Sequence, residues 1–292
     1  MTAPLLGHAV AGSNGAWRAF TLDPAIAAAL LAASLLYARG HARMGGSRRS
    51  AGRRRVTAFV LGEAVVAMAL LSPIDAISDD LFSMHMVQHL LLIVAAAPLL
   101  VVGRPGHTMM ASLPSRWRRL VVGRPLVVRF LVTGLPLLRL PAVAWTAFTL
   151  SLWLWHLPVV YEAAVETPWL HAIEHLAFLG TSMLVWSIAL EHRRREGLGV
   201  LGRALFLLAT AAQSGVLGAL LLFASTPLYS VHRAGAAAWG LTPLQDQQLA
   251  GALMWIPPSV VYLTAAAAML LRWFRWMGTS EAAHPVQVEG AP

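Results

Sequence analysis

The chain has 292 residues, of which 58% are apolar and only 12% are charged. A soluble domain keeps about a quarter of its residues charged, so this composition excludes an ordinary soluble protein and predicts one membrane-embedded domain. The net charge of +9 comes from arginines in alternate loops, a pattern typical of membrane orientation and not of nucleic-acid binding.

Seven stretches approach the roughly 20 apolar residues that a membrane-spanning helix needs. The first 20 residues lack the basic region, apolar core and cleavage site of a signal peptide, so no removable leader is predicted. An eighth segment, 120–138, contains Arg124 and Arg129. An arginine within a span costs about 2.5–3.5 kcal/mol, so this segment is predicted to be interfacial or re-entrant. The seven predicted spans are 20–38, 56–74, 81–103, 140–160, 169–190, 204–224 and 248–271.

The arginines predict the orientation of the spans. Twenty of the 22 arginines fall on one side of this arrangement, in the loops 39–55, 104–139 and 191–203 and just after the last span. The positive-inside bias makes that side cytoplasmic. The sequence therefore predicts an all-α, polytopic membrane helix bundle with seven transmembrane helices, the N-terminus out and the C-terminus in. Residues 1–278 form a single domain, and 279–292 are predicted to be a disordered cytoplasmic tail.

Five histidines lie at one predicted depth, at the outer ends of three consecutive spans. Two pairs have i,i+4 spacing, which places both rings on one helix face with about 5–6 Å between Cβ atoms. Ionisable residues in spans are costly and tend to mark functional sites. We therefore expect the rings to converge at the extracytoplasmic end of the bundle. The five are His85 and His89 in the third span, His156 in the fourth, and His171 and His175 in the fifth.

Histidine and methionine are the only candidate soft-metal ligands, because the chain has no cysteine. Imidazole suits Cu, Zn, Fe and Ni, whereas a thioether selects Cu(I), so Met86 and Met254 join the five histidines as candidate ligands.

Polar residues at the same predicted level are Gln88, Glu174 and Asp246, and they are predicted to orient the ring nitrogens from a second shell. Asp246 has an alternative interpretation as the N-cap of the seventh helix. His232 is predicted to be a solvated loop residue within reach of the site from above. Glu63, within the second span, is predicted either to pair with Gln213 or to relay protons.

Three segments together resemble a known family: MHMVQHLLLIVAAAPLLVVGRP, then WHLPVVYEAAVETPWLHAIEHLAFLGTSMLVW, then DQQLAGALMWIPP. In this order they resemble the CtaG-type cytochrome c oxidase assembly proteins of bacterial membranes. The resemblance implies a multi-pass protein of the bacterial cytoplasmic (inner) membrane that helps assemble haem–copper oxidase. It also implies delivery of copper to the oxidase, with zinc as the alternative metal. The expected partners are the lipid bilayer, the oxidase subunit carrying the copper site and a periplasmic copper chaperone, with no nucleic acid.

Two other functions stay open on the sequence. The segment HAIEH (His171, Glu174, His175) fits the H-x-x-E-H pattern of zinc peptidases, so an intramembrane zinc metallohydrolase is the alternative to a non-enzymatic copper-binding assembly factor. A membrane cytochrome that uses the histidines as haem ligands is a further alternative. Metal content discriminates between copper delivery and zinc hydrolysis, and light absorption would reveal haem.

Overall fold

A computed structural model describes residues 20, 23–45, 50–116, 140–190 and 198–282. The predicted interfacial segment 120–138 lies outside these residues, as do residues 283–292 of the predicted tail. The last helix continues to Ala282, so the first four residues of the predicted tail are helical.

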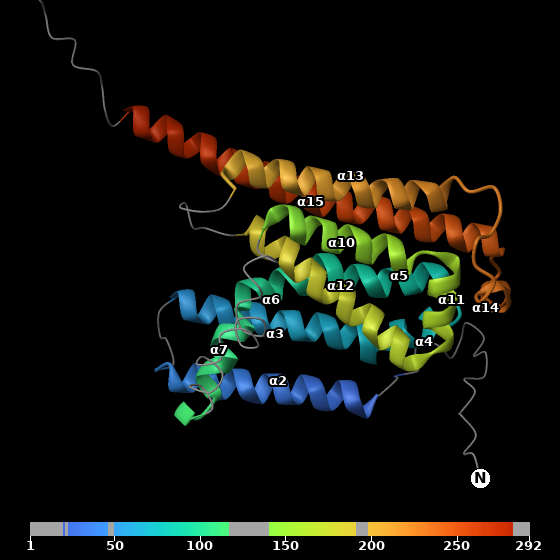
Figure 1. Cartoon of the computed structure of the whole chain (residues 1–292), viewed down its shortest axis with the longest axis horizontal. Coiled ribbons are helices and arrows are strands. Elements are labelled where there is room, and N and C mark those ends of the chain that lie inside the picture. The colour runs from blue at the N-terminus through green and yellow to red at the C-terminus, as the bar shows by residue number, and fades with distance from the viewer. Residues whose placement is uncertain (1–19, 21–22, 46–49, 117–139, 191–197, 283–292) are drawn as a thin grey trace, which may run out of the picture.

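Every regular element of the described residues is helical, and the helices pack side by side into an elongated bundle (Figure 1). One π-helical segment, η1, joins α5 to α6 within a single continuous span. The elements are α2 (Pro24–Arg43), α3 (Ser50–Leu71), α4 (Pro73–Ser78), α5 (Phe82–Leu90), η1 (Leu91–Ala96), α6 (Ala97–Gly103), α7 (Pro105–Ser112), α10 (Pro141–Trp155), α11 (Pro158–Glu166), α12 (Pro168–Ala189), α13 (Val200–Leu222), α14 (Arg233–Ala238) and α15 (Pro243–Ala282).

Five of the described helical stretches are long and apolar enough to cross a membrane: α2, Phe82–Gly103, α12, α13 and Pro243–Met277. Helices α10 and α11 meet the same criterion only as a pair, with a bend of 76° between them. Helix α3 is not among these stretches; it carries Glu63 and three consecutive arginines. The chain is thus a multi-pass membrane-type helix bundle. The number of seven spans and the orientation of both termini stay predictions.

The bend between α10 and α11 differs from the straight span expected over 140–160. Proline lacks a backbone N–H and disfavours a helical conformation in the residue before it, so a helix tends to stop ahead of a proline. Pro158 accordingly follows the end of α10 at Trp155, and His156 forms the C-cap of that helix. The corner therefore fixes His156 at a helix end, inside the bundle.

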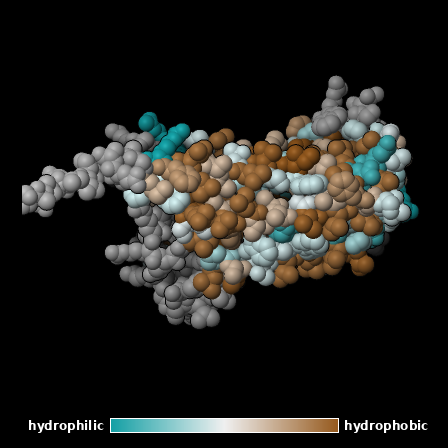
Figure 2. Space-filling model, turned by 90° about the horizontal axis from the view of Figure 1, so that it is seen from above, coloured by the Kyte–Doolittle hydropathy of each residue, from teal (hydrophilic) through white to brown (hydrophobic). Residues whose placement is uncertain are grey.

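The surface of the bundle suits a hydrocarbon environment. Figure 2 shows broad hydrophobic areas on the side of the bundle, with the most hydrophilic residues mainly near its two ends. Large apolar side chains point outward from separate helices, among them Leu150 in α10, Leu176 in α12 and Leu220 in α13. Exposed apolar surface on this scale would be a liability in water, whereas in a bilayer it faces lipid.

The two ends of the bundle differ in chemistry. At one end, here called the arginine end, Arg203 of α13 and Arg272 of α15 line a common pocket with Leu190, which follows α12. At the other, here called the histidine end, α5 and α12 begin and α4, α11 and α14 gather (Figure 1). A tight contact holds α14 there, because a Cβ on Gly235 would lie 2.2 Å from the backbone oxygen of Asp80.

The expected pairing of Glu63 with Gln213 is wrong. Glu63 accepts a hydrogen bond from the Ser34 hydroxyl of α2. The Gln213 side chain instead accepts one from the Trp153 indole N–H at 3.1 Å. Glu63 therefore joins α2 to α3, whereas Gln213 joins α13 to α10.

Candidate metal centre

Four side chains at the histidine end bring their ligand atoms together. His85 and His89 come from α5, and His171 and Glu174 come from α12. Each offers one nitrogen or carboxylate oxygen, and these atoms all lie within 4.8 Å of one another. This set is called the four-residue group below. Within it, the i,i+4 pair His85 and His89 of α5 lies opposite His171 of α12.

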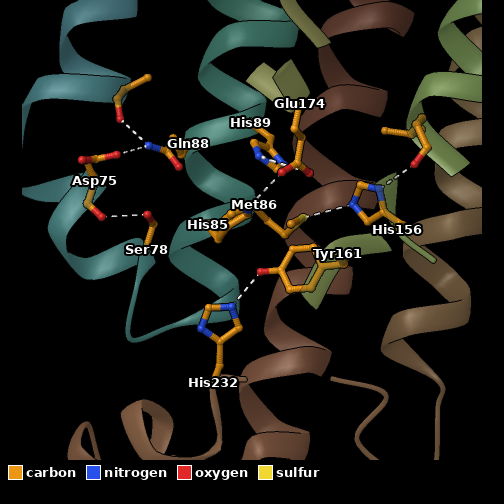
Figure 3. Close-up of polar contacts among 12 residues, drawn as sticks. Asp75, Ser78, His85, Met86, Gln88, His89, His156, Tyr161, Glu174 and His232 are labelled. Atoms are coloured by element: carbon orange, nitrogen blue, oxygen red, sulfur yellow. Dashed lines mark hydrogen bonds and ion pairs between the residues drawn. The ribbon is translucent and has the colours of Figure 1, made fainter. Parts of the chain in front are cut away.

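The contacts within the four-residue group are too long for hydrogen bonds. The Nε2 atoms of His85 and His89 lie 4.0 and 3.8 Å from the two carboxylate oxygens of Glu174 (Figure 3). Ligands bound to one ion at about 2.0–2.2 Å lie up to about 4.4 Å apart. The two measured separations therefore fit atoms placed around a shared ion.

The same atoms are buried and unsatisfied. Glu174, His85 and His89 are each at most 2% exposed. Among the described residues, no hydrogen-bond partner lies near either Glu174 oxygen, His85 Nε2, His171 Nε2 or either ring nitrogen of His89. Burying polar atoms without partners is costly, and burying an unpaired carboxylate is more so. A cation bound by these atoms would remove that cost, so three imidazoles and one carboxylate fit a divalent transition metal.

His175 stands beside the four-residue group. Its ring centroid lies 4.2 Å from that of His171 and 5.3 Å from that of His89. Its Nε2 atom is also buried and has no hydrogen-bond partner among the described residues. His175 is thus adjacent to the group without supplying one of its four converging atoms.

His156, predicted to join the same cluster, contacts a different partner. Its Nε2 atom lies 3.4 Å from the sulfur of Met86, and its Nδ1 atom lies 2.6 Å from the backbone oxygen of Leu152 (Figure 3). Met86 and Met254 are both buried and line one cavity with His89 and His156. The predicted ligands therefore divide into two neighbouring sets.

The three predicted second-shell residues play three different roles. Glu174 belongs to the four-residue group itself. Asp246 accepts hydrogen bonds from the backbone N–H groups of Phe82 and Ser83 at 2.7 and 3.0 Å. It therefore caps the start of α5, one turn before His85, and not its own helix. Gln88 points away from the imidazoles and donates to Asp75 and to the backbone oxygen of Ala69.

Two further residues lie beside the site: His232, which was predicted to be within its reach, and Tyr229, which the sequence interpretation did not single out. His232 was expected to be solvated, yet only 4% of it is exposed. Its Nε2 atom accepts a hydrogen bond from the Tyr161 hydroxyl at 2.7 Å, and its ring centroid lies 6.2 Å from that of His85 (Figure 3). Tyr229 donates to the backbone oxygen of His156. A buried histidine in a loop has no periodic pattern around it, so only tertiary contacts reveal it.

The comparison with known families agrees with this architecture. The model of the cytochrome c oxidase caa3 assembly factor family matches residues 15–276, which is most of the chain. Neither a curated protein nor a solved structure matches the chain. The match covers the histidine-bearing helices and the bend between α10 and α11 in one continuous range. The chain therefore belongs to the family of cytochrome c oxidase caa3 assembly factors.

Proposed function

We propose that this membrane protein binds copper at the four-residue group and delivers it to a cytochrome c oxidase subunit. Copper is here a cargo and not a resident cofactor. One observation carries the proposal: three imidazoles and one carboxylate come together inside the bundle. Their ligand atoms are buried and have no hydrogen-bond partner among the described residues. Membership of an oxidase assembly family supports copper as the metal, because haem–copper oxidase must acquire it.

The position of the four-residue group suits delivery. It lies where α5 and α12 begin, next to the outer segments that contain Tyr161 and His232. Tyr161 and His232 are joined by a hydrogen bond, and their ring centroids lie 5.1 and 6.2 Å from that of His85. A bond between two side chains breaks and re-forms more readily than a helix moves. We infer that this pair controls access to the group, and that a periplasmic copper chaperone meets the protein at this face.

The zinc-hydrolase alternative has weaker support in the geometry. The H-x-x-E-H pattern requires His171 and His175 to bind the metal together while Glu174 acts as the base. The atoms that converge come instead from His85, His89, His171 and Glu174, with His175 beside them. A non-catalytic role is therefore the better proposal.

Metal analysis tests the proposal. The detergent-purified protein should contain about one equivalent or more of copper, and the His85→Ala/His171→Ala variant should lose at least half of it. His107→Ala is the matched control, because His107 is an exposed histidine in α7. In a host strain that depends on this protein for its oxidase, cells that produce the double variant should lack oxidase activity in their membranes. Cells that produce the His107→Ala control should keep it. Unchanged copper in the double variant, or zinc in place of copper, would overturn the proposal.

A further inference from the structure

The contact between His156 and Met86 is not a hydrogen bond. The backbone oxygen of Leu152 can only accept, so His156 Nδ1, 2.6 Å away, carries the proton and donates it. In the neutral ring this leaves a lone pair on Nε2. That atom faces the Met86 sulfur at 3.4 Å, and a thioether has no proton to give. Two electron-pair donors therefore face each other with no hydrogen between them.

Protonating His156 would not resolve this arrangement. The cavity beside the pair is lined by Ile93, Phe148, Leu152 and other mostly apolar residues, and no carboxylate is among the lining residues described. An imidazolium there would be a buried charge without a counter-ion, which is costly. The whole His156 residue is only 5% exposed. A soft cation between the nitrogen and the sulfur would satisfy both lone pairs.

The separation of the two atoms suits a bound metal. At bond lengths of about 2.0–2.1 Å to an imidazole nitrogen and about 2.3 Å to sulfur, tetrahedral ligands lie about 3.5 Å apart. The measured 3.4 Å is close to that value. The adjoining cavity has a volume of about 20 Å³. That space is enough for about one water molecule or one ion.

Two further residues line this cavity. Met254, from α15, offers a second thioether, and His89 belongs both to the cavity lining and to the four-residue group. Among the described residues, neither ring nitrogen of His89 has a hydrogen-bond partner. A single imidazole thus stands between a set of nitrogen and oxygen ligands and a set that contains sulfur.

We propose that the bundle holds two adjacent metal positions, the second a Cu(I) site formed by Met86, His156 and Met254. This inference rests on the proposed function and makes it more specific. Thioether and imidazole ligands without a carboxylate select the soft, singly charged ion, whereas the four-residue group suits a divalent one. His89 lies between the two positions, because its ring belongs to the four-residue group and also lines the cavity of the second position.

Counting Cu(I) in single variants tests the two-position arrangement. The protein is titrated anaerobically with Cu(I) against a coloured Cu(I) chelator, and X-ray absorption reports sulfur ligation. The unaltered chain should bind about one equivalent of Cu(I) at the second position and show copper–sulfur scattering. Met86→Leu and Met254→Leu should each weaken the site by about tenfold or more and diminish the sulfur signal. The His85→Ala/His171→Ala variant should keep the sulfur-ligated ion.

The controls separate failure of this inference from failure of the proposed function. Leucine conserves the volume of methionine, so folding should persist, as elution from a sizing column and helical circular dichroism will report. Met183 lies in α12 and is not among the residues that line the cavity. Met183→Leu should therefore change neither the Cu(I) affinity nor the sulfur signal. If Met86→Leu binds as much copper with the same spectrum as the unaltered chain, the second site does not exist. If the His85→Ala/His171→Ala variant keeps all the copper that the purified unaltered chain contains, while the methionine variants lose the sulfur-ligated ion, the second site stands and the proposed function fails.

Discussion

Asp246 shows how one residue joins distant parts of the chain at the candidate metal centre. Its carboxylate, in α15, accepts from two backbone N–H groups that open α5. The first N–H groups of any helix lack partners within the helix, and a negative charge there also interacts favourably with the helix dipole. Asp246 thereby fixes the start of the helix that carries His85 and His89.

We expect Asp246→Asn to lower the affinity for copper about tenfold. This is the lower end of the losses in metal affinity that follow mutation of residues that orient metal ligands. The amide keeps the shape of the side chain but loses the charge and one of the two accepting oxygens. The measurement is a copper titration of the purified variant. Gln245→Ala, which removes only the side-chain contact of Gln245 with Thr242, serves as the control. An unaltered affinity in Asp246→Asn would contradict the positioning role.

The sequence predicted some of these residues better than others. The histidines of α5 and α12 follow the helical period, so their shared faces could be inferred from spacing alone. Gln88 lies on the same helix as His85, yet it turns toward Asp75, a partner whose position depends on the short helix α4. His232 is buried by contacts with Tyr161 and with the backbone of Asp79, more than 70 residues away in the chain. Contacts of this kind leave no local pattern.

At the scale of elements, glycines set how closely α13 and α15 approach. A Cβ on Gly251 would lie 2.5 Å from the backbone nitrogen of Leu222, and one on Gly218 would lie 2.8 Å from the backbone oxygen of Gly251. Small residues let helix backbones meet in membranes, where packing stabilises association. Because Gly251 lies between Asp246 and Met254, this close approach also places both of those residues.

Gly251→Ala should therefore destabilise the bundle by about 1–3 kcal/mol, the usual cost of overpacking. The added methyl group meets backbone atoms, which cannot rotate away as a side chain can. The temperature of unfolding in detergent, followed by circular dichroism, measures the effect. Gly180→Ala in α12 is the matched control, since nothing lies within 4 Å of its added Cβ. Equal unfolding temperatures for both variants would contradict the close packing.

The attachment of the 225–242 loop to α11 should depend on pH. Glu162 lies in α11 beyond the bend and outside the predicted span 140–160, and it accepts hydrogen bonds from the Ser230 hydroxyl and N–H at 2.6 Å each. These hydrogen bonds lower the pKa of the Glu162 carboxyl below its usual 4.5. A lowered pKa means that the attachment is complete above about pH 4.5 and is lost as the pH falls through the folded-state value.

Amide hydrogen exchange at Ser230 measures this attachment. Between pH 7 and pH 5, protection relative to the intrinsic rate should stay constant, and it should fall on further acidification. Glu162→Gln, which cannot ionise, should show weaker protection without the acid transition. A transition of equal size in Glu162→Gln would assign it to another group.

At the scale of the whole molecule, the arginine end and the histidine end give the bundle a polarity that membrane orientation requires. Clustered arginines favour the cytoplasmic side. The sequence predicted this polarity and the helical fold, because both follow from composition and loop charge. It did not predict the corner after α10, because a single proline can bend, end or merely follow a helix, and only packing decides among these outcomes.

The absence of cysteine from the chain makes orientation directly measurable. Ala237→Cys places one exposed thiol on α14 at the histidine end, and Ala42→Cys places one on α2 near the arginine end. In intact cells stripped of any outer envelope, a membrane-impermeant maleimide should label Ala237→Cys at once. It should label Ala42→Cys only after the membrane is permeabilised. The reverse pattern would invert the predicted topology.

Helix α15 contains Pro257 and Pro258 in its interior. Since a proline has no N–H, the carbonyls one turn earlier, those of Leu253 and Met254, lose their helical hydrogen bonds. A helix with this interruption flexes at lower cost than one with a complete ladder. The interruption therefore falls at Met254, which brings a thioether to the cavity, so a bend of α15 at this point would widen or narrow that space.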